Sequence, residues 1–371
     1  MSVQVSYKKQ FLVFFLIIIL ALGITELILQ LSDVLVLSCY FESSPLFSNI
    51  DFFSKKQICF NYTDLEFDIS QPFKQNKNSQ YFEYITINSD GYRGDEIIKK
   101  SANEFRIFIL GGSTTFGIVS TSDENTISGY LENFFYIDDL DFVNVINAGV
   151  PGANSRDEYF HLKTKLIEFE PDLVIMYDGW NDITSRTTFM HLSDEEYETK
   201  PQSETIQINK TEKSGTGILK FFEIINYKTG IKLGAWIKSI YVIEEYGKDS
   251  ERIDNFSKKN WMNACSLGQK NNFDVVIVLQ PILGTSDREL SSHENSFNWG
   301  NFEKNNLQYM KDFNFSSNDL SKECKLLVDM RHTFDGINEP VFWDNGHTSD
   351  FGNKIIAEKL FNKILPLIEN R

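Results

Sequence analysis

Five short apolar runs recur along the chain after residue 104, and they constrain its fold more than any other feature. Each run is rich in β-branched and aliphatic residues, is bounded by turn residues and mostly lacks alternation of polar and apolar positions. The runs are Phe105–Leu110, Val143–Ala148, Asp172–Tyr177, Asp274–Gln280 and Lys325–Met330. Strands without alternation are buried on both faces, as in a parallel sheet that helices cover on both sides.

Helical patterns separate these runs, at roughly residues 124–136, 155–169 and 254–271. A last helix follows the fifth run, with one apolar stripe that comprises Ile355, Ile356, Leu360, Phe361, Ile364 and Ile368. This alternation of strands and helices predicts an α/β fold built on an open parallel sheet of about five strands. In such sheets the functional site lies beyond the carboxyl ends of the strands.

Residues suited to nucleophilic catalysis follow these strand ends. Ser113 follows the first run, and Asp344 and His347 follow the fifth. A serine hydroxyl needs a base within hydrogen-bond reach and a third group that orients the base. Asp344 can hold His347 Nδ1–H, which leaves Nε2 to take the proton of Ser113. The backbone N–H groups of Ser113 and Gly149 and the side-chain amide of Asn181 are the candidate oxyanion donors.

Two alternatives concern single parts of this set. The glycine-rich turn GGSTTFG at residues 111–117 could instead cradle a phosphate, but it lacks the lysine of a Walker loop and the glycine spacing of a dinucleotide site. His332 is the nearest rival for the base, because Asp329 stands three residues before it. That pair straddles the end of the fifth run and lacks the helix that closely follows His347.

As a set, these segments resemble the blocks of the SGNH (GDSL-like) hydrolase superfamily. GGST carries Ser113, NAGVPGANS carries Gly149, GWND carries Asn181, and DNGH carries Asp344 and His347. Gly112 stands where the family more often has Asp. INSDGYRGDE (Ile87–Glu96) also resembles a segment that precedes the first block in membrane-anchored members. The resemblance covers about residues 84–371. It implies a flavodoxin-like three-layer α/β/α sandwich and ester hydrolysis through an acyl-enzyme, without a metal or organic cofactor.

The N-terminal segment Phe11–Leu31 is almost entirely apolar and would be about 31 Å long as a helix, which matches a bilayer core. Lys8 and Lys9 precede it, and the next basic residue is Lys55. The positive-inside rule then predicts a single-pass protein with a cytoplasmic N-terminus and an extracytoplasmic catalytic domain. The alternative is a signal peptide, cleaved near Ala21–Gly23, and a secreted protein.

This interpretation divides the chain into three parts. Residues 1–34 are a cytoplasmic stub and membrane anchor, residues 35–103 an extracytoplasmic lead-in, and residues 104–371 the hydrolase domain. An insertion at about residues 183–250 follows the third strand, and we interpret it as a cap over the site. The formal net charge of −16 argues against a nucleic-acid partner, which would need a basic surface.

The four cysteines, Cys39, Cys59, Cys265 and Cys324, lack the spacing of a metal site. Outside the cytoplasm they could form two disulfides, with Cys39–Cys59 as the obvious local pair, or they could be buried free thiols. Altogether the sequence predicts a membrane-anchored serine esterase that acts on an ester-bearing small molecule, lipid or glycan. The alternatives are an O-acyltransferase of the same superfamily acting on a cell-surface polysaccharide, and a catalytically silent binding protein.

Overall fold

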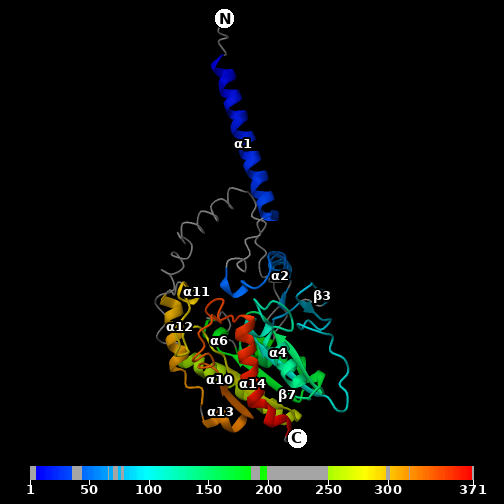
Figure 1. Ribbon diagram of the computed structural model, residues 1–371. Coiled ribbons are helices and arrows are strands. Elements are labelled where there is room, and N and C mark those ends of the chain that lie inside the picture. Colours follow the sequence, from blue (N-terminus) through cyan, green and yellow to red (C-terminus); the bar gives the residue numbers. More distant parts are fainter. Residues whose placement is uncertain are drawn as a thin grey trace. The chain divides into compact units, whose positions relative to one another are not determined.

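The computed structural model describes residues 6–35, 44–65, 67–69, 74–76, 79–184, 193–198, 250–297, 301–316 and 318–369. The chain divides into two compact units (Figure 1). One unit comprises Met1–Glu42 and Asn209–Tyr246, and the other comprises Ser43–Ile208 and Gly247–Arg371. The second unit contains the five predicted strands and every candidate site residue.

The described part of the first unit is one long helix, α1 (Tyr7–Leu35). Its segment Tyr7–Ile24 is long and apolar enough to cross a membrane, and none of that segment is buried in protein. A signal sequence near an N-terminus has the same properties. The helix therefore fits both sequence interpretations, the anchor and the leader.

A five-stranded parallel sheet forms the centre of the second unit, with the strand order β6-β5-β7-β8-β9. The strands are β5 (Phe105–Gly111), β6 (Val143–Gly149), β7 (Leu173–Asp178), β8 (Asp274–Leu279) and β9 (Leu326–Asp329). These are the five runs identified in the sequence, so the predicted α/β fold is confirmed. Because β5 pairs with both β6 and β7, the ends of these three strands lie side by side.

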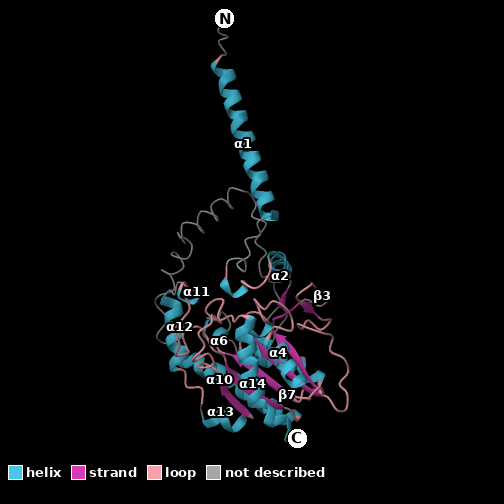
Figure 2. Cartoon of the chain, viewed as in Figure 1, coloured by secondary structure: helices cyan, strands magenta, loops and turns pink. Residues whose placement is uncertain are grey.

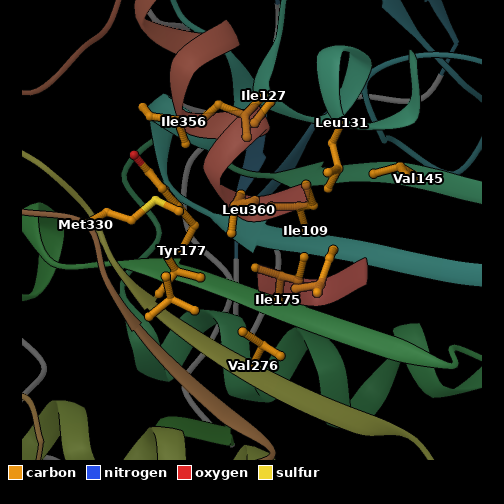
Figure 3. Packing of buried hydrophobic residues seen from close by; sticks show 14 of the residues in the cluster. Ile109, Ile127, Leu131, Val145, Ile175, Tyr177, Val276, Met330, Ile356 and Leu360 are labelled. Atoms are coloured by element: carbon orange, nitrogen blue, oxygen red, sulfur yellow. The ribbon is translucent and has the colours of Figure 1, made fainter. Parts of the chain in front are cut away.

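Helices cover both faces of this sheet, which makes three layers (Figure 2). On one face, α4 (Ile127–Ile137) and α14 (Asp350–Glu369) pack against alternate strand residues. Figure 3 shows this core, with Ile109 and Ile175 of the sheet facing Leu131 and Leu360 of the two helices. Because the remaining strand residues are buried on the other face, the strands have no polar side in the sequence.

The opposite face is covered by α5 (Ser155–Thr164), the 3-10 helix η2 (Leu166–Phe169) and α10 (Ser250–Asn271). Trp261 of α10 is fully buried there. Its indole N–H donates to Asp178 Oδ2 at 2.7 Å, at the end of β7. The third predicted helix is thus fixed to the sheet by an apolar surface and by a buried polar contact.

Shorter elements surround this core. They are the helices η1 (Pro45–Phe47), α2 (Phe52–Asp64), α3 (Ser113–Phe116), α6 (Trp180–Thr184), α7 (Asp194–Glu198), α11 (Ser292–Asn295), α12 (Asn301–Asp312) and α13 (Asn318–Glu323), and the strands β1 (Phe67–Ile69), β2 (Lys74–Asn76), β3 (Gln80–Tyr81) and β4 (Thr86–Ile87). Most of the predicted insertion at residues 183–250, and with it the predicted cap, lies outside the described residues.

The described cysteines are oxidised. Cys265 of α10 forms a disulfide with Cys324, which directly follows α13. Cys59 is also disulfide-bonded. The alternative of buried free thiols is therefore wrong for these three residues. Cys39, the predicted partner of Cys59, lies outside the described residues.

Two carboxyl groups are buried together between α5 and the sheet. Glu158 is 2% exposed and Asp178 is 3% exposed. Burial raises the pKa of Glu158 well above its ordinary value, and the neighbouring charges of Asp178, Asp182 and Asp157 raise it further. Burial also raises the pKa of Asp178. The folded protein therefore holds a proton at this pair that the unfolded chain would release near its ordinary carboxyl pKa.

This raised pKa predicts how stability depends on pH. The contribution of Glu158 to the free energy of unfolding is fully present below its pKa of about 4.5 in the unfolded chain. It is lost as the pH rises through the higher pKa of the folded protein. We expect Glu158→Gln, which keeps the shape and stays neutral, to remove this loss. Between pH 5 and pH 8, wild type should lose unfolding free energy relative to the variant, by about 1.4 kcal/mol for each pH unit over which the folded protein alone keeps the proton.

Urea unfolding at several pH values measures this difference. The exposed Glu358→Gln serves as the matched control, because it makes the same chemical change on the surface of α14. Parallel stability curves for wild type and Glu158→Gln would contradict the protonated buried pair.

Candidate active site

Ser113 lies where the central strand β5 turns into the short helix α3. The strand ends at Gly111, Gly112 is the N-cap, and Ser113 is the first helical residue. The turn leaves no room for a larger residue at its start, because a Cβ on Gly111 would lie 2.0 Å from Thr115 Oγ1 and 2.8 Å from the Tyr177 carbonyl oxygen. Glycine thus lets the strand bend sharply and present the serine at the carboxyl edge of the sheet.

The structure brings Ser113, His347 and Asp344 together. His347 Nε2 lies 2.8 Å from Ser113 Oγ, although 234 positions separate the two residues in the chain. His347 Nδ1 lies 2.8 Å from Asp344 Oδ2. The other oxygen of that carboxylate accepts the backbone N–H groups of Gly346 at 2.9 Å and His347 at 2.7 Å. The aspartate therefore fixes the loop as well as the imidazole.

The electrostatics of this pair follow from its geometry. Burial lowers the pKa of His347, but the charge of Asp344 and its hydrogen bond outweigh burial, so the pKa lies above 6.5. Burial would raise the pKa of Asp344, yet the imidazole and the two backbone donors lower it below 3.8. An ionised carboxylate beside an imidazole that readily holds a proton is the arrangement that general base catalysis by histidine needs.

Asn181 lies directly over the turn that carries the serine. Its Nδ2 donates to the Ala153 carbonyl oxygen at 2.6 Å and would lie 2.0 Å from a Cβ built on Gly112. The family more often has aspartate at the position of Gly112. The Cβ of such an aspartate would clash with the Asn181 amide in its present place. The absence of a side chain at Gly112 lets the amide approach the backbone next to Ser113.

The assignment of Gly149 to the oxyanion donors needs correction. Its backbone N–H already donates to Asn147 Oδ1 at 3.0 Å. A Cβ there would lie 2.2 Å from the Phe116 nitrogen, so this glycine allows α3 to pack closely on β6. It serves packing, and its N–H is not available to an oxyanion while this bond is intact.

Gly152, three residues later, is a better candidate donor. It has a left-handed φ of 81° and precedes Ala153, whose carbonyl oxygen holds the Asn181 amide. Among the described residues, the backbone N–H groups of Gly152 and Ser113 have no acceptor. The segment NAGVPGANS contains both Gly149 and Gly152, and their spacing alone does not indicate which of them donates to an oxyanion.

Asp182, the neighbour of Asn181, was also not identified from the sequence. Its carboxylate is buried and accepts Ser155 Oγ–H at 2.6 Å and the Ser155 backbone N–H at 3.3 Å. These bonds tie α6 to the start of α5. The loop that contains Gly152 and Ala153 directly precedes that start, so Asp182 links the two elements that carry the candidate oxyanion donors.

The rival base His332 lies elsewhere. It is exposed and faces Asp335, with its Nδ1 3.2 Å from Asp335 Oδ2. The carboxylate of Asp329 instead pairs with Arg331. Ser113 thus has His347 as its imidazole partner. Within the described residues, Asp287, His332 and Asp335 form an exposed group whose ligand atoms lie within 4.8 Å of one another, and it includes none of the three candidate catalytic residues.

Two partly buried tryptophans border the histidine loop. A Cβ on Gly346 would lie 3.6 Å from the Trp180 ring, which is ordinary van der Waals contact. The Trp343 and His347 rings lie edge to face, with centroids 6.3 Å apart. The loop that presents the imidazole is therefore packed against Trp180, which follows β7, and against its own Trp343.

The close approach of Asn181 to Gly112 gives a test of the oxyanion arrangement. We expect Gly112→Ala to displace the Asn181 amide and to lower kcat, by up to the 10²–10³-fold that loss of one oxyanion donor typically costs. KM should change little. Steady-state hydrolysis of p-nitrophenyl acetate measures both constants. Gly346→Ala is the matched control, because it adds the same methyl group nearby, where there is room. Equal kcat in Gly112→Ala and wild type would contradict the arrangement.

Comparison with known proteins identifies a family for most of the second unit. The profile of the GDSL-like Lipase/Acylhydrolase family matches residues 107–360, which is more than half of the chain. No curated protein matches. Similar solved structures include the acetyl xylan esterase AlAXEase, with 16% identity, a TM-score of 0.40, and coverage of 70% of this chain and 100% of that one.

Two further solved structures are similar to the same extent. A putative lipolytic protein of the G-D-S-L family from Desulfitobacterium hafniense DCB-2 has 12% identity and a TM-score of 0.39, covering 70% of this chain and 99% of its own. Axe2, an acetylxylan esterase from Geobacillus stearothermophilus, has 12% identity and a TM-score of 0.40, covering 72% and 96%. At these values the substrates of those enzymes say nothing about the substrate of this chain. On the family profile, the chain belongs to the GDSL-like lipase/acylhydrolase family and is a carboxylic ester hydrolase.

Proposed function

We propose that the chain is a membrane-anchored, extracytoplasmic serine esterase that works through an acyl-enzyme on Ser113. The observation that carries the proposal is the imidazole of His347, which lies 2.8 Å from both the serine hydroxyl and the carboxylate of Asp344. Family membership alone would not assign roles to single residues.

In the first half-reaction, Ser113 Oγ attacks the ester carbonyl carbon while His347 Nε2 takes the hydroxyl proton. Asp344 accepts Nδ1–H and stabilises the imidazolium that forms. The tetrahedral intermediate collapses as the C–O bond to the alcohol breaks, and the imidazolium returns its proton to the leaving oxygen. A water molecule then repeats the sequence on the acyl-enzyme, with His347 again as base, and releases the acid.

The negative oxygen of the intermediate needs donors that are already in place. We assign this role to the backbone N–H groups of Ser113 and Gly152 and to the Asn181 amide. One hydrogen of Asn181 Nδ2 is committed to the Ala153 carbonyl oxygen, which leaves the second for the oxyanion. Asp182 and Ser155 fix the relative position of these elements.

The residues around the catalytic imidazole indicate only a broad class of substrate. Trp343 lies edge to face with the catalytic imidazole, and Trp180 lies beside Gly346, the residue before His347; both tryptophans are only partly buried. Partly exposed aromatic rings offer a large apolar contact area to a bound substrate. We therefore propose an ester carried by a glycan or a lipid as the substrate, with a small molecule bearing the same ester as the simplest probe.

We propose the location from two features. The apolar α1 has the length and composition of a single membrane span, with Lys8 and Lys9 on the cytoplasmic side. The disulfide between Cys265 and Cys324 is typical of an oxidising compartment. The domain organisation then consists of the anchor at residues 1–34, the lead-in at residues 35–103 and the catalytic part at residues 104–371.

Removal of the nucleophile gives the first test of this function. We expect the full chain, purified in detergent, to hydrolyse p-nitrophenyl acetate, and Ser113→Ala to lower kcat by about 10³-fold or more. Ser286→Ala is the matched control, since its hydroxyl bonds to the Arg331 carbonyl oxygen outside the site. Absence of turnover in wild type, or equal turnover in Ser113→Ala, would refute the esterase.

The pH profile tests the roles of the base and its partner. Because His347 must be neutral to accept a proton, kcat/KM should rise with pH through a pKa above 6.5. Asp344→Asn removes the charge that raises this pKa, so we expect its inflection at lower pH together with a large loss of kcat. An inflection that stays in place in Asp344→Asn would contradict the assigned pair.

A further inference from the structure

The motif INSDGYRGDE lies before the family-matched segment, yet one of its residues reaches the helix of the candidate nucleophile. This residue is Arg93, which belongs to the lead-in and is 3% exposed. Its backbone forms isolated antiparallel bridges to Ile87 and to Asn147 of β6. The lead-in is therefore built into the second unit beside the strand ends.

The guanidinium of Arg93 holds the C-terminal end of α3. Its Nη1 donates to the carbonyl oxygens of Phe116 at 3.1 Å and Gly117 at 2.9 Å, the last residue of the helix and its C-cap. Its Nε pairs with Asp123 Oδ1 at 2.7 Å. It also lies over the Phe116 ring, with Cζ 5.2 Å from the centroid.

Tyr62 of α2 reinforces the same point. Its hydroxyl donates towards the Gly117 carbonyl oxygen at 2.5 Å and the Ser120 carbonyl oxygen at 2.7 Å, and it accepts from Arg93 Nη1 at 3.2 Å. Two residues from outside the matched segment thus converge on the carbonyl groups at which α3 ends.

The need for such support follows from the length of α3. A helix of four residues cannot stabilise itself, because nucleation is unfavourable and its last carbonyl groups lack helical partners. A cation at the C-terminal end donates hydrogen bonds to these carbonyl groups and interacts favourably with the negative end of the helix dipole. Ser113 is the first residue of the same single turn, so any tilt of α3 moves Oγ relative to His347 Nε2.

We propose that Arg93 is a positioning residue, which acts through α3 to hold Ser113 in line with His347, and that the lead-in is thereby a working part of the catalytic unit. This inference rests on the proposed function, because it takes Ser113 as the nucleophile. Asp123 completes the support. Its carboxylate orients the guanidinium and also accepts the Thr86 backbone N–H at 3.0 Å, within the lead-in.

Arg106 provides a closely matched control. It is also a buried arginine, pairs with Glu104 at 2.7 Å and donates to the carbonyl oxygens of Phe169 and Ile98, both at 2.9 Å. It lies near the start of β5, whereas Ser113 follows the end of that strand. Substitution of either arginine removes a buried hydrogen-bond network, but only Arg93 contacts α3.

The experiment compares Arg93→Lys with Arg106→Lys in the full chain. It measures kcat and KM for p-nitrophenyl acetate, the rate constant for labelling by a fluorophosphonate, and Tm. We expect Arg93→Lys to lower kcat and the labelling rate by about 10–10²-fold at unchanged KM, since small misplacements of a reacting group have effects of that size. Arg106→Lys should lower Tm and leave both rates at wild-type values.

Tyr62→Phe decides the matter if Arg93→Lys does not fold, because it removes one hydroxyl and no charge. It should lower the labelling rate in the same direction by a smaller factor. Wild-type rates in the folded Arg93→Lys, or equal losses in the two lysine variants, would overturn the positioning role. A wild-type chain that neither hydrolyses the ester nor reacts with the probe would instead refute the proposed function, and the role of Arg93 would fall with it.

Discussion

Parallel pairing of β5 with β6 and β7 is the constraint on which the candidate site depends. It places the turn with Ser113, the loop with Gly152 and the helix with Asn181 at one edge of the sheet. The loop after β9 adds His347 to the same edge, where it meets the serine hydroxyl. Residues from four distant parts of the chain can form one site because each of them follows the end of a buried strand.

Glycine residues allow the close approach of backbone and side chains at this edge. Gly112 makes room for the Asn181 amide, and Gly149 makes room for the backbone of α3. Because the elements lie so close together, residues outside the segment that matches the family also contact the helix that carries Ser113. The single helical turn α3 packs between β6 and the lead-in. Arg93, Tyr62 and Asn147 donate hydrogen bonds to the carbonyl groups at its end.

The strands and the spatial meeting of Ser113, Asp344 and His347 could be predicted, because buried strands have a distinctive composition and the order of polar residues after them is informative. The oxyanion donors could be predicted only in part. Nothing in NAGVPGANS reveals that the Asn147 side chain takes the Gly149 N–H, since that bond depends on the local backbone. Arg93 was beyond prediction for a similar reason, because its partners are carbonyl groups, which every residue has.

The proposed function depends above all on Ser113 as the nucleophile that becomes acylated. Peptide mass spectrometry of the full chain after reaction with a fluorophosphonate tests it most directly, because the probe forms a bond only with an activated serine. We expect one adduct, on the peptide that contains Ser113, and its loss in a chain that carries His347→Ala. An adduct on another serine, or an unchanged adduct on Ser113 without His347, would contradict it.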